Sequence, residues 1–166
     1  GERRKLAAPC GLYCGVCGVY VAHKNNDTKF KERLKDIYFV GAEDIKCEGC
    51  LSDVLFKYCI SCPIRACAAS KGIEGCHQCS DFPCKFIDDF PLGVGKKVIL
   101  RAIPTWKRLG TEKWMEEEEE DTTAPIVAIS YSGEQKGAGT VKSQLTQIDF
   151  FIKRAYPVQM AVFYFQ

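Results

Sequence analysis

No apolar stretch in the sequence approaches the about 20 residues that a helix needs to cross a bilayer, so we expect no membrane association. The N-terminal segment has basic residues but no apolar run behind them, which predicts no signal peptide and a cytoplasmic location. The net charge is only +2, so charge gives no support to nucleic acid as a partner, and a protein partner stays equally unspecified. Apolar residues make up 46% of the chain, which is enough to build a packed core.

Familiar catalytic motifs are absent as well. The sequence has no phosphate-binding Walker loop, no Ser/His/Asp order and no H-E-x-x-H zinc motif. No cysteine stands apart from the others with an obvious histidine partner, so a nucleophilic cysteine has no specific support. Whether the protein is an enzyme stays open, and the sequence leans toward a protein that is not one.

The sequence is rich in cysteine. All eleven cysteines lie at or before position 84, and none lies from 85 to 166. An odd number of cysteines without an export signal argues against a disulfide framework. Reduced thiols that cluster in this way bind metal, and we expect all of them to be metal ligands. They are Cys10, Cys14, Cys17, Cys47, Cys50, Cys59, Cys62, Cys67, Cys76, Cys79 and Cys84.

The spacing of the last eight cysteines predicts two four-thiolate sites. A C-x2-C pair folds into a tight knuckle, and four sulfurs at about 2.3 Å from one ion make a structural zinc site. A glycine inside or before a knuckle, as at Gly49 and Gly75, permits close backbone approach. Interleaved ligand sets would use the same residues, so the partition stays open. The two sets are Cys47, Cys50, Cys59 and Cys62, and Cys67, Cys76, Cys79 and Cys84.

The segment "PCGLYCGVCGVY" poses a different problem, because it supplies only three thiols, spaced C-x3-C-x2-C, at Cys10, Cys14 and Cys17. Radical enzymes hold an iron–sulfur cluster with this spacing, and thiolate-rich sites suit both zinc and iron–sulfur. The chain is too short for the barrel of those enzymes, so zinc is the expected cofactor and an iron–sulfur cluster the alternative. We expect the trio to converge on one centre. A fourth ligand would be His23 or a later cysteine, and His77 is a further candidate.

Helical patterns fill the gaps between the cysteines, and clear strand patterns are missing before residue 120. The expected fold class is a small α-rich domain, α+β at most, in which metal ions act as staples and zinc knuckles lie between short helices. We divide the chain into a cysteine-rich metal-binding domain (1–90), an amphipathic helical extension (91–120) and an anomalous tail (121–166).

Local signals set the expected helix boundaries. One helix is capped by Asp27 and ends at Gly41, and another runs from Pro63 to Gly72. A short helix ends before Pro91. Pro104 predicts a kink or break in the next helix, and Thr111 is expected to cap the last one.

Two charged regions are interpreted as solvated surface. The acidic run from Glu116 to Asp121 is typical of a solvated helix end or linker. The basic residues of the segment 96–108, Arg101 among them, are spread around their helix and are expected to aid solubility.

These motifs together resemble a known family. "PCGLYCGVCGVY", "CEGC" and "CPIRACAASKGIEGCHQCSDFPC" are similar, over residues 8–90, to the prokaryotic cysteine-rich proteins grouped as a domain of unknown function with expected zinc binding. The resemblance implies metal binding, no established activity and ligand positions for nine cysteines. These are Cys10, Cys14, Cys17, Cys50, Cys62, Cys67, Cys76, Cys79 and Cys84.

The sequence therefore predicts a zinc-binding interaction or structural module of unknown cellular role. Two alternatives stay open at this point. One is an iron–sulfur redox or radical-type enzyme that uses the N-terminal trio, and the other is a small-molecule or metal-handling protein.

The tail from about residue 121 departs from that family, whose members often end in a zinc ribbon of two C-x2-C pairs. A reading frame shifted by one base permits cysteine codons at Ala124, Val127, Ala138 and Val141, in ribbon spacing. We interpret the tail as a frameshifted ribbon, with a native chain end as the alternative. The apolar "PVQMAVFYF" would then favour self-association.

Overall fold

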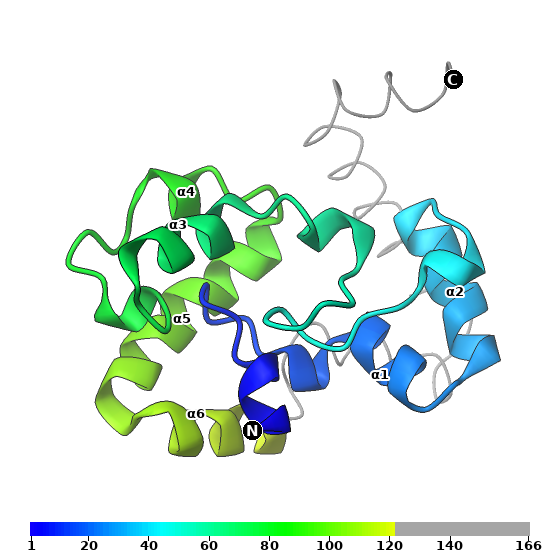
Figure 1. Ribbon diagram of the computed structural model, residues 1–166, viewed down its shortest axis with the longest axis horizontal. Coiled ribbons are helices and arrows are strands. Elements are labelled where there is room, and N and C mark those ends of the chain that lie inside the picture. Colours follow the sequence, from blue (N-terminus) through cyan, green and yellow to red (C-terminus); the bar gives the residue numbers. More distant parts are fainter. Residues whose placement is uncertain (122–166) are drawn as a thin grey trace.

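The computed structural model describes residues 1–121, and the interpretation of the tail lies outside them. Figure 1 shows the helices in two groups, α1 and α2 at one end and α3 to α6 at the other. Their bounds are α1 (Gly18–Lys24), α2 (Thr28–Tyr38), α3 (Pro63–Lys71), α4 (Lys85–Asp88), α5 (Gly93–Leu109) and α6 (Thr111–Glu120). Five 3-10 turns complete the pattern: η1 (Glu2–Leu6), η2 (Cys14–Val16), η3 (Ala42–Asp44), η4 (Lys57–Cys59) and η5 (Cys76–Gln78).

The helical class expected from the sequence is confirmed. Residues 1–121 contain no strand, and an isolated antiparallel bridge joins Ala7 to Tyr13. Among these residues no helix combines the length and apolar character that crossing a membrane requires. The irregular segments between the helices carry most of the cysteines, so the positions of these loops decide which thiols meet.

The side chain of Asp27 caps α2 as the sequence predicts. Its Oδ1 accepts the backbone N–H of Phe30 at 2.9 Å, which satisfies one of the donors that every helix start leaves unpaired. The helix ends at Tyr38, where Phe39 takes a left-handed conformation with φ of 54°. The predicted end at Gly41 was therefore wrong by a few residues, because a non-glycine residue adopts the terminating conformation.

Replacing this cap should weaken α2 measurably. We expect Asp27→Ala to lower the free energy of unfolding by about 1 kcal/mol, because the Phe30 N–H loses its acceptor. Asp27→Ser keeps an acceptor oxygen and serves as the matched control. Urea unfolding of the two variants measures both, and equal midpoints would contradict the capping role.

The boundaries of α3 agree with the sequence, but the interpretation of Pro104 as a break is wrong. α3 begins at Pro63 and ends before Gly72, which has a positive φ of 65°. α5 continues through Pro104, which lies on its exposed side, where water can take the place of the lost backbone donor. Packing of the opposite, buried face holds this helix together.

Thr111 is not the cap of α6, since the residue in that position is Gly110. The Thr111 hydroxyl instead joins two distant groups. It accepts the indole N–H of Trp106 at 3.0 Å and donates to a carboxylate oxygen of Glu74 at 3.0 Å. Thr111, expected to cap α6, therefore links α5 and α6 to the segment before η5.

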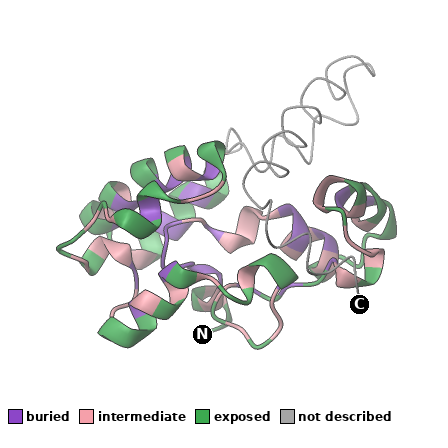
Figure 2. Ribbon diagram, turned by 90° about the horizontal axis from the view of Figure 1, so that it is seen from above, coloured by how far each residue is buried: buried purple, intermediate pink, exposed green. Residues whose placement is uncertain are grey.

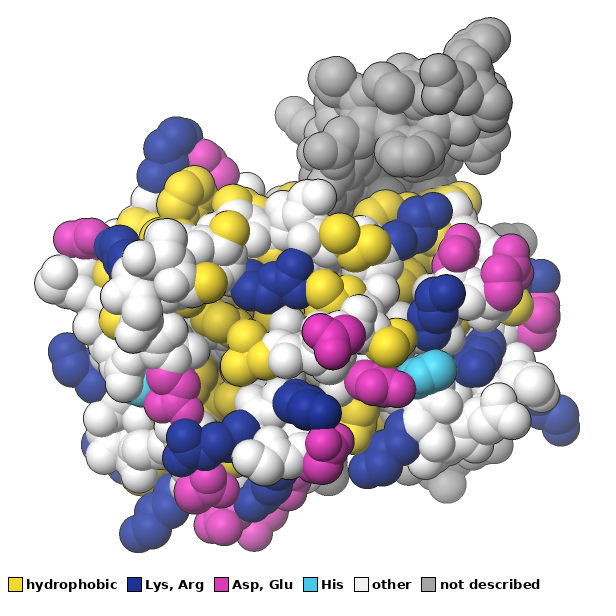
Figure 3. Space-filling model, viewed as in Figure 1, with side chains coloured by type: hydrophobic (Ala, Val, Ile, Leu, Met, Phe, Trp, Pro, Cys, Tyr) yellow, Lys and Arg dark blue, Asp and Glu magenta, His cyan; other side chains and the backbone are white. Residues whose placement is uncertain are grey.

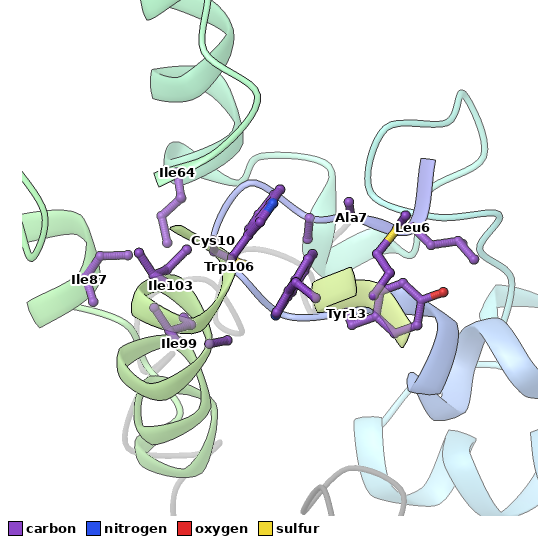
Figure 4. Packing of buried hydrophobic residues seen from close by; sticks show 13 residues of the cluster. Leu6, Ala7, Cys10, Tyr13, Ile64, Ile87, Ile99, Ile103 and Trp106 are labelled. Carbon is purple, nitrogen blue, oxygen red and sulfur yellow. The ribbon is translucent and has the colours of Figure 1, made fainter. Parts of the chain in front are cut away.

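Buried side chains form two hydrophobic clusters, visible as purple segments in Figure 2. Figure 4 shows the large cluster, with Ile64, Ile87, Ile99 and Ile103 gathered on one side of Trp106. The large cluster consists of Leu6, Ala7, Ala8, Cys10, Tyr13, Ile64, Ile87, Ile99, Ala102, Ile103, Trp106, Trp114 and Met115. The small cluster consists of Val19, Ala22, Phe30, Leu34, Ile45, Cys47 and Phe56. α5 and α6, the predicted extension, therefore supply part of the same core as the cysteine-rich segments.

The acidic run of α6 is not wholly solvated, which corrects the sequence interpretation. Glu118 is 2% exposed and accepts two hydrogen bonds of 2.9 Å from the Arg101 guanidinium. Glu119 accepts hydrogen bonds from Arg3 and from the Tyr13 hydroxyl. These residues join α6 to α5 and to the N-terminal segment, so Arg101 is a structural partner as well as a surface charge.

Candidate metal centres

Four of the predicted ligands line one pocket. They are Cys67 on α3, Cys76 at the start of η5, Cys79 just after it and Cys84 before α4. We call these four residues the C-terminal quartet. Burial, together with the neighbouring thiols of Cys84, Cys79 and Cys67, raises the pKa of Cys76 to about 11, as expected for groups that lie close together.

Backbone contacts hold the η5 knuckle against the rest of the protein. The N–H of Cys76 donates to the carbonyl of Pro9 at 2.8 Å, and the N–H of Cys79 donates to the carbonyl of Cys76 at 3.1 Å. A Cβ at Gly75 would lie 2.7 Å from the Trp106 ring, so only glycine lets the knuckle approach α5 this closely. The large cluster thus fixes the position of half of the quartet.

Lys71 supplies a positive charge at the edge of this pocket. Its Nζ lies 3.3 Å from the Cys79 sulfur and 2.7 Å from Oδ2 of Asp81. The charge of Lys71 opposes the increase in the pKa of Cys76, because it favours the thiolate form. A cation beside thiolates offsets part of the negative charge that four such ligands bring to a divalent ion.

Across residues 1–121, no three His, Cys, Asp or Glu side chains are already arranged to hold an ion. The quartet shares a pocket but does not form a closed tetrahedron. In structural metal sites the ion itself commonly completes the ligand arrangement. The backbones of these four cysteines already surround one pocket.

The first predicted set also lies close together, in the loop from Cys47 to Cys62. Burial, together with the neighbouring thiols of Cys17, Cys47, Cys50 and Cys62, raises the pKa of Cys59 to about 12. Gly49, with φ of 114°, lets this loop pass the N-terminal segment, where a Cβ would lie 2.6 Å from the Lys5 carbonyl oxygen. Thiols from two regions of the sequence therefore meet here.

The N-terminal trio is divided between the two clusters. Cys10 is buried in the large cluster and Cys14 packs against it, whereas Cys17 packs against the small cluster. The later loop places thiols at both clusters. Cys50 and Cys62 pack against the large cluster, and Cys47 and Cys59 lie in or against the small cluster. The convergence of the trio on one centre stays a prediction, and the packing favours ligand sets that mix trio and loop.

Neither histidine lies among the residues lining the quartet pocket. His77 stacks on Trp106 at a ring separation of 4.0 Å, and its Nε2 lies 3.8 Å from a carboxylate oxygen of Glu74. Burial lowers the pKa of His77, and Glu74 opposes this effect. His23 is half-buried in the last turn of α1. Metal ligation by either residue stays a prediction.

Arg65 is a residue of these sites that the sequence patterns did not single out. Its guanidinium donates to the carbonyl of Cys50 at 3.3 Å and to that of Ile60 at 2.6 Å. Arg65 therefore connects α3 to both knuckles of the loop. Lys71 was missed in the same way. A basic residue within one helical turn of a clustered cysteine is the signal that could have found both.

The surface around the centres carries no field of a single sign. On the face in Figure 3, basic and acidic side chains are interspersed around a hydrophobic middle. Mixed charge of this kind gives little long-range attraction to polyanions.

Comparison with known proteins gives one match. The family described as "Protein of unknown function (DUF3795)" matches residues 6–89, which contain all eleven cysteines. No curated protein and no solved structure shows significant similarity to the chain. The expected membership of a domain-of-unknown-function family is thereby confirmed, while zinc binding stays a prediction and no activity is assigned.

Proposed function

Because the chain belongs to the DUF3795 family, whose function is unknown, we propose from its own residues that it is a zinc-binding structural module. The C-terminal quartet holds one zinc ion in this proposal, and the ion staples α3, η5 and α4 to the large cluster. The observation that carries the proposal is the single pocket that all four thiols line. As a role in the cell, we propose a scaffold for interactions with other molecules.

The donor set of this pocket fits zinc. Soft thiolate ligands select zinc or iron–sulfur clusters over magnesium and calcium, and four thiolates satisfy the tetrahedral preference of a structural zinc ion. Lys71 places a positive charge 3.3 Å from the Cys79 sulfur, where it would offset part of the negative charge of the thiolates. When bound, the ion would supply cross-linking between distant segments, and Pro9 and Trp106 would hold the η5 knuckle in place.

The metal content of the full chain tests this proposal. Protein purified anaerobically without added metal should contain zinc and be colourless, and Cys67→Ser should contain one zinc ion fewer per chain than the unaltered protein. Ser80→Ala, an exposed neighbour of the pocket residues, is the control and should keep the full zinc content. Brown protein containing iron and sulfide would instead support the iron–sulfur alternative. Equal zinc content in Cys67→Ser and Ser80→Ala would overturn the quartet site.

A further inference from the structure

Both C-x2-C pairs of the loop from residue 47 to residue 62 are divided between the two hydrophobic clusters. The first cysteine of each pair lies in or against the small cluster, and the second packs against the large cluster. Two cysteines of the N-terminal trio also belong with the large cluster. Packing therefore groups thiols that the spacing of the motifs does not pair. We give the name mixed quartet to the four cysteines of the large cluster that lie outside the C-terminal quartet: Cys10, Cys14, Cys50 and Cys62.

Main-chain contacts hold this loop against the N-terminal segment. The N–H of Leu51 donates to the carbonyl of Lys5 at 3.1 Å, and Gly49 passes the same carbonyl closely. Cys50 lies between these two loop residues, and its own N–H donates to the Cys14 sulfur. A neutral thiol is a weak acceptor, whereas a thiolate is stabilised by such a donor. The path of the backbone thus brings Cys50 beside Cys14.

The start of α3 brings Cys62 to the same place. Cys62 is the N-cap residue of α3, and no side-chain hydrogen bond caps this helix. The positive end of the helix dipole favours a thiolate at this position. Arg65 donates to the carbonyl of Cys50 at 3.3 Å, so the first turn of α3 is fastened to the loop. Burial raises the pKa of Cys50, and the Arg65 charge opposes this increase.

Cys10 joins the group from the side of the core. It is 7% exposed and is itself a member of the large cluster. Burial raises its pKa, and the thiols of Cys50 and Cys62 raise it more than the thiol of Cys76 does. Cys76 lines the pocket of the C-terminal quartet, whereas Cys10 is not among the residues of that pocket. Cys10 therefore belongs with the mixed quartet.

α3 separates the two quartets, because it carries a cysteine of each. Cys62 and Cys67 are five residues apart, which corresponds to a rotation of about 500° and leaves them about 140° apart around the helix axis. Cys67 lines the pocket of the C-terminal quartet, and Cys62 does not. Each quartet also has its own basic residue on this helix, since Arg65 contacts the loop of one quartet and Lys71 contacts a sulfur of the other. The two groups of thiols therefore lie on different sides of α3.

We propose that the mixed quartet is a second four-thiolate zinc site. Four soft thiolates suit a tetrahedral zinc ion, and the Cys50 N–H and Arg65 supply outer-shell support. Across residues 1–121 no group of ligands is already closed around an ion, so the ion itself would complete the arrangement. When bound, it would join the N-terminal segment, the loop and α3. This inference rests on the proposed zinc binding, but its ligands are separate from the C-terminal quartet.

Zinc content per chain, measured by native mass spectrometry on full-length variants, tests which thiols share an ion. Cys14→Ser and Cys50→Ser should each hold one zinc ion fewer than the unaltered protein, and the double variant should hold no fewer than either. Cys47→Ser is the matched control, because Cys47 comes from the same C-x2-C pair as Cys50. Its effect on zinc content should add to that of Cys14→Ser. Additive losses for Cys14→Ser and Cys50→Ser would overturn the mixed quartet.

Graded chelation of the unaltered, zinc-loaded protein gives a second readout that does not depend on whether a variant folds. As zinc is withdrawn, alkylation mapped by mass spectrometry should reach all four thiols of the mixed quartet in equal proportion. If Cys47 and Cys59 instead matched Cys50 and Cys62 while Cys14 did not, the ligands would follow the motif spacing and the mixed quartet would be wrong.

The outcomes also separate this inference from the proposed function. Loss of an ion in Cys14→Ser without a loss in Cys67→Ser would keep the mixed quartet and overturn the C-terminal site. Loss in Cys67→Ser alone would keep the C-terminal site and overturn the mixed quartet. Two separate sites predict that the double variant of Cys14 and Cys67 loses two ions. A chain that binds no zinc would overturn both proposals.

Discussion

A strong chelator should unfold residues 1–121 of this protein at room temperature. Structural zinc contributes on the order of 10–16 kcal/mol of apparent binding free energy per site, whereas a typical domain has a net stability of roughly 5–15 kcal/mol. The quartet joins α3, η5 and α4, and η5 presses Gly75 against Trp106 of the core. Loss of the proposed ion would therefore remove a restraint on the loops between these elements.

Circular dichroism and tryptophan fluorescence measure this prediction. Trp106 and Trp114 are stacked at a ring separation of 4.1 Å and are fully buried, so their emission should shift to the red when the core opens. Zinc added back under reducing conditions should restore both signals, and magnesium, a hard cation, should not. A metal-free chain that retained its helical signal and a cooperative thermal transition would contradict the staple role.

Removing the Arg101 side chain should produce the second large loss of stability. Glu118 is almost fully buried, and it is bound by Arg101 and by the indole N–H of Trp114 at 3.1 Å. Breaking a buried pair by removing one partner typically costs 3–5 kcal/mol, because an uncompensated charge remains. The Arg101 side chain is 45% exposed, so water can screen part of the effect. We expect Arg101→Met to lower the free energy of unfolding by about 3 kcal/mol.

Urea unfolding of the protein measures how much the pair of Arg101 and Glu118 contributes to stability. Lys107→Met removes an exposed cation from the same helix and should change the midpoint little. Glu118→Gln should cost less than Arg101→Met, because the amide still accepts from Trp114 and leaves the half-exposed arginine free to be hydrated. If Arg101→Met and Lys107→Met had the same midpoint, the buried pair would have no measurable role.

Features that depend on a few neighbouring residues could be predicted from the sequence. Asp27 caps a helix through a residue only three positions away, and Pro63 and Gly72 mark the two ends of α3 by their own backbone preferences. The four cysteines of the quartet line one pocket, because two of them form a knuckle and the others lie within a short distance along the chain.

Features that depend on tertiary packing could not be predicted. Glu118 looks like its neighbours in an acidic run, and only the position of Arg101 on another helix makes its burial possible. Thr111 carries a helix-start signal, but Trp106 and Glu74 use its hydroxyl. The placement of Cys10 and Cys17 in different clusters depends on which apolar surfaces each loop covers, and spacing alone does not contain that information.

The contacts of the N-terminal segment impose an order on synthesis. The Arg3 guanidinium donates to Glu119, which lies 116 positions later. The carbonyl of Pro9 accepts from the N–H of Cys76. At roughly 5–20 residues per second, a ribosome needs on the order of 5–20 s to make the roughly 100 intervening residues. During that interval the three cysteines of the N-terminal trio have been made, while α6, which packs against η2 and shares the large cluster with Cys10, has not. A nascent chain of this protein therefore exposes its first thiols to oxidants and competing metals until translation has passed α6.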